Sequence, residues 1–137
     1  MNKDWWILNI VFVNKLMEKK PLLSIVSPIF NEEECIEEFL NRVESTTRKL
    51  PCEYEIILIN DNSTDSTEKK IINICEKNHK VKLINLSKNF GHQPALLCGL
   101  INAKGDYVIS LDSDLQDPPE LITRIYDELT TKNFDVV

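Results

Sequence analysis

Glycine is scarce in this sequence, with only three among 137 residues. There is no G-x-G-x-x-G segment, which excludes the dinucleotide-binding loop whose clustered glycines let the backbone approach a pyrophosphate. Basic residues are also few: 16 Lys and Arg stand against 22 Asp and Glu, leaving a net charge of −6. Nucleic-acid binding needs a concentrated positive face to neutralise phosphates. We therefore expect no nucleic-acid partner.

Long hydrophobic runs are absent as well. The most apolar stretch near the N-terminus, Trp5 to Val13, is interrupted by Asn9, and a membrane span needs about 20 apolar residues. The segment also lacks the basic start and the small-residue cleavage site of a signal peptide. We expect residues 1–20 to be an N-terminal extension and residues 21–137 to form the folded domain.

The four cysteines contain no C-x-x-C pair. Zinc sites and redox motifs use closely spaced pairs, and disulfides belong to oxidising compartments. We interpret these residues as reduced, mostly buried thiols and expect a cytoplasmic protein. They are Cys35, Cys52, Cys75 and Cys98.

Apolar runs rich in β-branched residues alternate with segments of helical spacing. Strands are predicted at 22–29, 55–59, 81–86 and 107–111, with a fifth beginning at 134–137. Helices are predicted over 33–50, from Asp65, over 94–103, and from Asp117 with Pro118 in its first turn. The third helix is apolar on nearly every side, so we expect it to be heavily covered. This order predicts an α/β fold: a doubly wound, mostly parallel sheet with helices on both faces.

Ligands of such sheets bind outside the carboxyl ends of the strands. In this sequence those ends carry polar loops, SPIFNEE, LINDNSTDS, LSKNFGH and LDSDLQDPP. The loops at the other edge of the predicted sheet show no comparable pattern. The sequence therefore places a candidate site at one edge of the sheet.

The loop LDSDLQ holds closely spaced carboxylates. The two-residue period of an extended chain puts Asp112, Asp114 and, if the chain stays extended, Gln116 on one side. Two carboxylates so close repel unless a cation lies between them. Mg²⁺ or Mn²⁺ would suit this site, since these ions take oxygen ligands from carboxylates and phosphates. The alternative is a solvated acidic turn that caps the next helix.

The other loops offer weaker signals. Asp61 follows a strand directly and could accept a hydrogen bond from a nucleobase or ribose, although alone it indicates only a good turn. Phe30 and Glu32 suit a base that is stacked and held by its edge, while the same segment also reads as a helix start. Lys88 precedes a helix N-terminus, where anions bind, yet such a lysine is usually a solvated charge. His92 is more typical of a hydrogen-bonded or capping histidine than of a ligand, and we do not expect it to be the catalytic base.

Taken together, SIVSPIFNEEE, EIILINDNSTDST and NLSKNFGHQPALLCGLINAKGDYVISLDSDLQDPPE resemble the family 2 glycosyltransferases. The resemblance covers residues 22–137 and is greatest to the branch of dolichyl-phosphate mannose synthases and polyprenyl-phosphate (undecaprenyl-phosphate) glycosyltransferases. It implies a GT-A fold and an inverting transfer of a sugar from a UDP- or GDP-sugar donor to a polyprenyl phosphate, a lipid-phosphate acceptor. The residues departing from the usual pattern are Phe30, where Tyr is frequent, and NDNS in place of DDGS, which makes the base less predictable.

The resemblance also implies roles for individual residues. Asp112 and Asp114 would form the D-x-D catalytic site for metal and diphosphate, and Gln116 would complete the metal shell. Asp61 would contact the base. The remaining implied nucleotide-binding residues are Pro28, Phe30 and Glu32 in the nucleoside pocket and Lys88, Asn89 and Gly91 along the nucleotide wall.

A complete GT-A domain continues with an acceptor-binding half, and the lipid-phosphate branch usually adds transmembrane helices. We therefore expect residues 21–137 to be the nucleotide-sugar-binding part without that half, which binds a nucleotide but transfers little or no sugar by itself. The longer enzyme would lie at the cytoplasmic face of the membrane. Uncovered apolar surface would favour a homo-oligomer.

Two other functions stay open on the sequence. In a phosphatase of the haloacid-dehalogenase type, Asp112 would be the nucleophile and Asp114 the acid/base, but the upstream nucleotide loops would then be unexplained. The second is a non-catalytic nucleotide-binding or assembly module.

Overall fold

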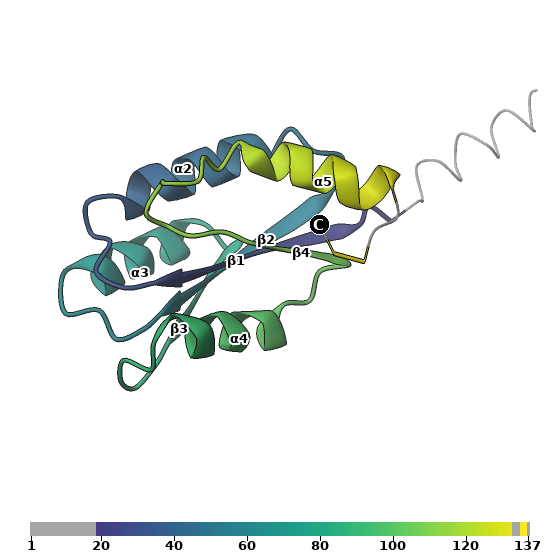
Figure 1. The fold of residues 1–137 in the computed structure, drawn as a ribbon. Helices are drawn as coiled ribbons and strands as arrows, with labels where there is room; N and C mark the ends of the chain where they lie inside the picture. The colour runs from purple at the N-terminus through teal and green to yellow at the C-terminus, as the bar shows by residue number, and fades with distance from the viewer. Residues whose placement is uncertain (1–18, 133–134, 137) are drawn as a thin grey trace, which may run out of the picture.

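The computed structural model describes residues 19–132 together with Asp135 and Val136. Strands and helices alternate through this part of the chain, as the sequence predicted (Figure 1). The strands are β1 (Leu22–Ile29), β2 (Glu53–Asn60), β3 (Val81–Asn85) and β4 (Tyr107–Ser110). The helices are α2 (Ile36–Thr47), α3 (Thr67–Lys77), α4 (His92–Asn102) and α5 (Leu121–Thr131).

The strands form one parallel sheet in the order β3-β2-β1-β4. β1 lies between two neighbours, pairing along its whole length with β2 and over Leu23–Val26 with β4. Figure 1 shows α2 and α5 on one side of the sheet and α4 on the other. The α/β, doubly wound arrangement with helices on both faces is therefore confirmed.

Alternate side chains of β1 and β2 pack into two cores, one on each face of the sheet. The larger core packs the strands against α2, α3 and α5 through residues such as Phe39, Ile71 and Ile122, all fully buried. The smaller one lies beneath α4 and comprises Val26, Ile57, Ile59 and Ala95. Burial on both faces explains why these strands are nearly continuous apolar runs.

Gly99 sets how closely α4 approaches the sheet. A Cβ atom at this position would lie 2.3 Å from Cγ1 of Val26 and 2.4 Å from Cδ1 of Ile59. Real Cβ atoms essentially never lie so close to another atom, so α4 or the buried side chains of Val26 and Ile59 would have to shift. A glycine is therefore required here for close packing, although it lowers helix propensity.

The heavy covering predicted for α4 is wrong within the described chain. Leu97, Leu100 and Ile101 have exposed fractions of 57%, 42% and 73%. Only the side of α4 that faces the sheet is buried. The helix consequently presents an apolar outer face, which the nearly uniform hydrophobicity of its sequence could not reveal.

The predicted start of the last helix is also wrong. α5 begins at Leu121 rather than Asp117. Pro119 disfavours helical backbone at the residue before it, which is Pro118. The two prolines instead form a turn in which their carbonyls accept hydrogen bonds from Leu121 and Ile122. Of the fifth strand expected at 134–137, residues 134 and 137 lie outside the described residues, and Asp135 and Val136 are not in a strand.

All four cysteines carry free thiols, but the prediction that most of them are buried is wrong: Cys52 is buried, and Cys35, Cys75 and Cys98 are partly exposed. No helix of the described residues combines the length and the apolarity needed to cross a bilayer.

A buried carboxylate joins the elements at the edge of the sheet opposite the polar loops. Glu55 accepts hydrogen bonds from the Ser24 hydroxyl at 2.6 Å and from the Lys104 backbone N–H at 2.9 Å, and it pairs with the ammonium of Lys82. Burial by itself would raise the pKa of Glu55. The bonds from Lys82, Ser24 and Lys104 outweigh it and hold the pKa below the ordinary value of 4.5.

We predict that Glu55→Gln destabilises the fold by about 2 kcal/mol at pH 7, because hydrogen bonds to a charged, buried group are lost. Since the folded-state pKa is lowered, this contribution is present above the unfolded value and is lost as pH falls through the folded one. Urea denaturation at pH 7 and pH 3.5 should show that the difference in unfolding free energy between variant and wild type narrows at the lower pH.

Glu53→Gln on the same strand is the matched control. Glu53 is exposed and paired with Lys80, so its loss should cost under about 0.5 kcal/mol. A gap of equal size at both pH values would contradict the assignment.

Candidate active site

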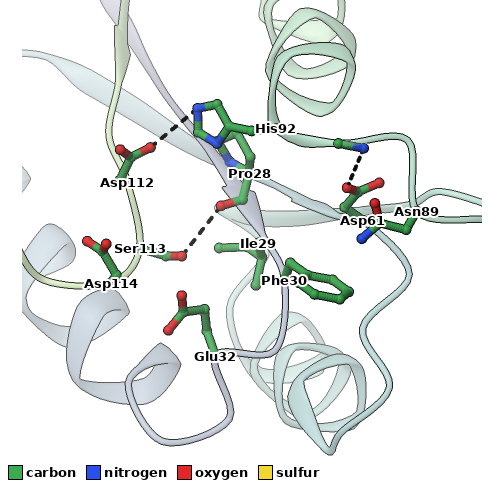
Figure 2. Close-up of a pocket in the computed structure, with 11 residues that line it drawn as sticks. Pro28, Ile29, Phe30, Glu32, Asp61, Asn89, His92, Asp112, Ser113 and Asp114 are labelled. Carbon is green, nitrogen blue, oxygen red and sulfur yellow. Dashed lines mark hydrogen bonds and ion pairs between the residues drawn. The ribbon is translucent and has the colours of Figure 1, made fainter.

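The carboxyl ends of the strands meet at one edge of the sheet and border an open cavity of about 370 Å³ (Figure 2). β1 contributes its last residues and the loop that follows, β2 contributes Asp61, the β3–α4 loop contributes the wall beside α4, and β4 contributes the acidic loop. The lining residues are Pro28, Ile29, Phe30, Glu32, Asp61, Asn89, Gly91, His92, Asp112, Ser113 and Asp114.

The acidic loop after β4 places two exposed carboxylates on the cavity wall. Asp112 and Asp114 both line it, and the buried Ser113 between them donates a hydrogen bond to the Pro28 carbonyl at 3.4 Å. This bond fixes the loop to the end of β1. The pair of aspartates therefore lies where the two-residue period placed it.

The extended conformation does not continue beyond Asp114. Leu115 takes a left-handed backbone (φ 62), and the Gln116 N–H turns back to donate to Oδ1 of Asp114 at 3.0 Å. Gln116 is not among the residues that line the cavity. That Gln116 binds a metal stays a prediction. The prediction assumed an extended chain after Asp114, and the chain turns there instead.

Glu32 faces this acidic loop across the cavity (Figure 2). Partial burial raises the pKa of its carboxyl group, and the negative charges of Asp114 and then Asp65 raise it further. The mouth of the cavity thus concentrates negative charge that a bound cation would relieve.

Asp61 is buried at the end of β2, and both of its carboxylate oxygens are engaged. Oδ1 accepts the backbone N–H of Phe90 at 2.7 Å, and Oδ2 accepts that of Gly91 at 2.8 Å. Gly91 lies at φ 97, a backbone conformation that glycine adopts without strain. Asp61 therefore holds the β3–α4 loop against the cavity, a role that sequence reasoning missed because it depends on the three-dimensional approach of two loops.

Two asparagines provide tight turns at the site, and one of them, Asn62, stands where the DDGS pattern has glycine. Asn31 (φ 52) and Asn62 (φ 58) both take left-handed backbone, which asparagine tolerates better than most residues. The Asn31 side chain accepts the Thr64 N–H at 2.8 Å, and its backbone N–H donates to Ser63 Oγ at 3.0 Å. Asn31 therefore joins the first two polar loops instead of capping α2, whose N-cap is Cys35.

The remaining predicted residues differ in their placement. The Phe30 ring is half exposed at the cavity wall, and Asn89 lies beside Asp61 (Figure 2). Lys88 does not line the cavity. Its ammonium instead lies 4.9 Å from the centre of the Phe90 ring, a cation–π contact outside the cavity.

His92 lines the cavity, although the sequence favoured a capping or merely hydrogen-bonded histidine. Its Nε2 lies 3.6 Å from Oδ1 of Asp112. The signal available in the sequence was its position directly after Gly91, at the first residue of α4. That position brings its ring over the end of β1 toward β4 (Figure 2).

We predict that Asp114→Asn lowers the pKa of Glu32 toward 4.5, because one of the charges that raises it is removed. The shift should be partial, since burial of Glu32 is unchanged. Asparagine retains an oxygen for the Gln116 N–H, so the loop should keep its shape. An NMR titration of the Glu32 carboxyl carbon measures the change, and Asp127→Asn, an exposed acid on α5, is the control of equal charge. A Glu32 pKa that is the same in Asp114→Asn and wild type would contradict the facing arrangement.

Comparison with known proteins agrees with this geometry. The family model described as Glycosyl transferase family 2 matches residues 24–137. An undecaprenyl-phosphate 4-deoxy-4-formamido-L-arabinose transferase of Proteus mirabilis is 41% identical over 123 residues, covering 88% of this chain and 37% of that protein. A bactoprenol glucosyl transferase of Shigella phage SfV is 42% identical over 106 residues, covering 77% of this chain and 34% of that protein.

The fold has a counterpart among solved structures. A mannosyltransferase from Pyrobaculum calidifontis, in complex with GDP-Man and Mn²⁺, superposes with a TM-score of 0.69 at 21% identity, covering 90% of this chain and 39% of that one. At this identity the likeness concerns the fold alone. The chain spans little more than a third of the length of the curated relatives that it matches. With the family model matching most of its length, the chain belongs to glycosyl transferase family 2.

Proposed function

We propose that this chain carries the nucleotide-sugar site of an inverting glycosyltransferase that moves a sugar from a UDP- or GDP-sugar to a polyprenyl phosphate. The observation that carries the proposal is a cavity in which Asp112 and Asp114 lie opposite the wall formed by Phe30 and Glu32. The names of the relatives, which act on undecaprenyl phosphate and bactoprenol, support a lipid-phosphate acceptor.

A nucleoside diphosphate fits the distribution of groups along the cavity. The half-exposed Phe30 ring offers a face on which a base can stack, and the Asn89 amide beside it can bond a base edge. At the other end are the carboxylates of Asp112 and Asp114. These alone would repel a diphosphate, so the proposal needs a cation at that end.

The donor atoms fit Mg²⁺ or Mn²⁺. Both aspartates offer exposed carboxylate oxygens on the same wall, which is the kind of ligand that these ions prefer. The described residues hold no group of three His, Cys, Asp or Glu side chains able to bind a metal by themselves. Asp112 and Asp114 would therefore share the ion with diphosphate oxygens and water, and Gln116 would join them only if its loop rearranged. A bound divalent ion supplies Lewis-acid stabilisation of the departing diphosphate.

The chain's own residues then orient the donor and set its charge environment. Phe30 and Asn89 hold the nucleoside end, while Asp112 and Asp114 fix the diphosphate end through the ion. A lipid phosphate is already anionic near neutral pH, so attack on the sugar requires no strong general base.

The proposal extends to the setting of the whole protein. Its acceptor would be membrane-bound, and in this proposal the full-length enzyme acts at the cytoplasmic face of the membrane. The apolar outer face of α4, with Leu97, Leu100 and Ile101 exposed, supports self-association of the isolated chain.

We predict that calorimetry detects binding of UDP or GDP and that Mn²⁺ raises the affinity by about tenfold or more, because the ion offsets the repulsion between carboxylates and diphosphate. Asp114→Ala should remove the Mn²⁺-dependent gain while leaving the thermal unfolding temperature nearly unchanged, since Asp114 is exposed. Asp127→Asn on α5 serves as the control and should bind like wild type. Equal affinity for both nucleotides with and without Mn²⁺ would refute the metal–diphosphate site.

We further predict that the 137-residue chain transfers little or no sugar to a polyprenyl phosphate, since it spans only about a third of its relatives. Extraction of labelled sugar into an organic phase measures the transfer. Lipid-linked product that disappears in Asp112→Asn would contradict the prediction of inactivity. Hydrolysis of p-nitrophenyl phosphate that disappears in the same variant would instead favour the phosphatase, and nucleotide binding without metal dependence would favour a non-catalytic module.

A further inference from the structure

The β3–α4 loop depends on Asp61 for its attachment. Within the described part of the chain, residues 87–91 make only two hydrogen bonds to anything outside the loop and its own helix, and both go to the Asp61 carboxylate. The last bond before them is from Leu86 to the Asn60 carbonyl, and the next is from Ala95 back to Gly91. Lys88, Asn89 and Phe90 are otherwise exposed.

The same attachment reaches across the cavity. The backbone N–H of Gly91 donates to Asp61, which follows β2. The next residue, His92, has its Nε2 3.6 Å from Oδ1 of Asp112, which lies in the loop after β4 on the other side of β1. The first turn of α4 therefore lies between Asp61, which follows β2, and Asp112, which follows β4 (Figure 2). A displacement of this turn would alter the cavity at both its ends.

We infer that Asp61 is a positioning residue: by holding the Phe90 and Gly91 amides it fixes the first turn of α4, and with it the diphosphate end of the cavity. This inference rests on the proposed function. It differs from a direct base contact because both carboxylate oxygens already accept backbone N–H groups, and because the effect should be felt at Asp112, on the far side of β1. Hydrogen bonds from backbone N–H groups to a buried carboxylate are among the stronger ones in proteins.

The two roles of Asp61 predict different binding losses. If it only contacted the base, Asp61→Asn would weaken binding of the nucleoside and leave binding of inorganic pyrophosphate with Mn²⁺ unchanged. As a positioning residue, its replacement should also weaken pyrophosphate binding, by about tenfold, since the wall at Gly91 and His92 is no longer fixed. Calorimetry with uridine, guanosine and Mn²⁺-pyrophosphate separates the outcomes, with Asp127→Asn as the control of equal charge.

Amide hydrogen exchange provides a test that needs no ligand. In wild type the Phe90 and Gly91 amides should be protected, and in Asp61→Asn or Asp61→Ala they should exchange at least about tenfold faster while amides of β1 and β2 stay unchanged. Asparagine preserves the shape of the side chain and keeps the test usable if the alanine variant does not fold. Unchanged protection of both amides, or unchanged pyrophosphate affinity, would overturn the inference. If wild type binds no nucleotide or pyrophosphate, the proposed function fails, and the exchange rates still decide whether Asp61 holds the loop.

Discussion

The parallel pairing of β1 with β2 and β4 is the constraint on which the candidate site depends. β1 and β2 are in register over eight residues, so both end at the same level of the sheet. β4 joins the other side of β1 in the same direction, and its loop returns to the end of β1 through Ser113. Pro28 at the end of β1 and Ser113 in the loop after β4, 85 residues apart in sequence, are thereby brought together. A shift of one residue in either pairing would turn every side chain of the strand to the opposite face.

The acids of this sheet fall into two groups by their bonding. Both carboxylate oxygens are bonded in the buried Glu55, at the edge opposite the polar loops, and in the buried Asp61, at the site edge. In contrast, Glu32, Asp112 and Asp114 have few partners and face a shared cavity, where burial and the charges of neighbouring acids raise the pKa of Glu32. Satisfied acids are typical of structural positions. Unsatisfied acids around a cavity are typical of sites whose missing partner is a ligand.

Local sequence patterns predicted much of the fold and part of the site. The bounds of β1 were predicted to the residue, because a parallel strand buried on both faces is a nearly continuous apolar run, and here the run extends from Leu22 to Ile29. The placement of Asp112 and Asp114 on the cavity wall also followed from the strand period. Gln116 was extrapolated from the same period, which fails at the left-handed turn of Leu115.

Contacts between distant loops could not be predicted from the sequence. Nothing near Asp61 in sequence indicates that its oxygens accept the Phe90 and Gly91 amides, or that Lys88 turns to the Phe90 ring and away from the cavity. The exposure of Leu100 and Ile101 on α4 was equally hidden, since a helix that is apolar all round carries no signal for which side is covered. Which sides of an element are occupied depends on its neighbours and not on its own residues.

The close approach at Gly99 ties the cavity to a point remote from it. α4 is a stiff rod, and Gly99 lies about 10 Å along its axis from His92 at 1.5 Å per residue. Val26 and Ile59 lie directly beneath Gly99, which is the point where α4 packs closely against the sheet. A side chain introduced at Gly99 would tilt α4 and displace its first turn at His92, so a substitution at this position would alter the shape of the cavity as well as the packing against the sheet.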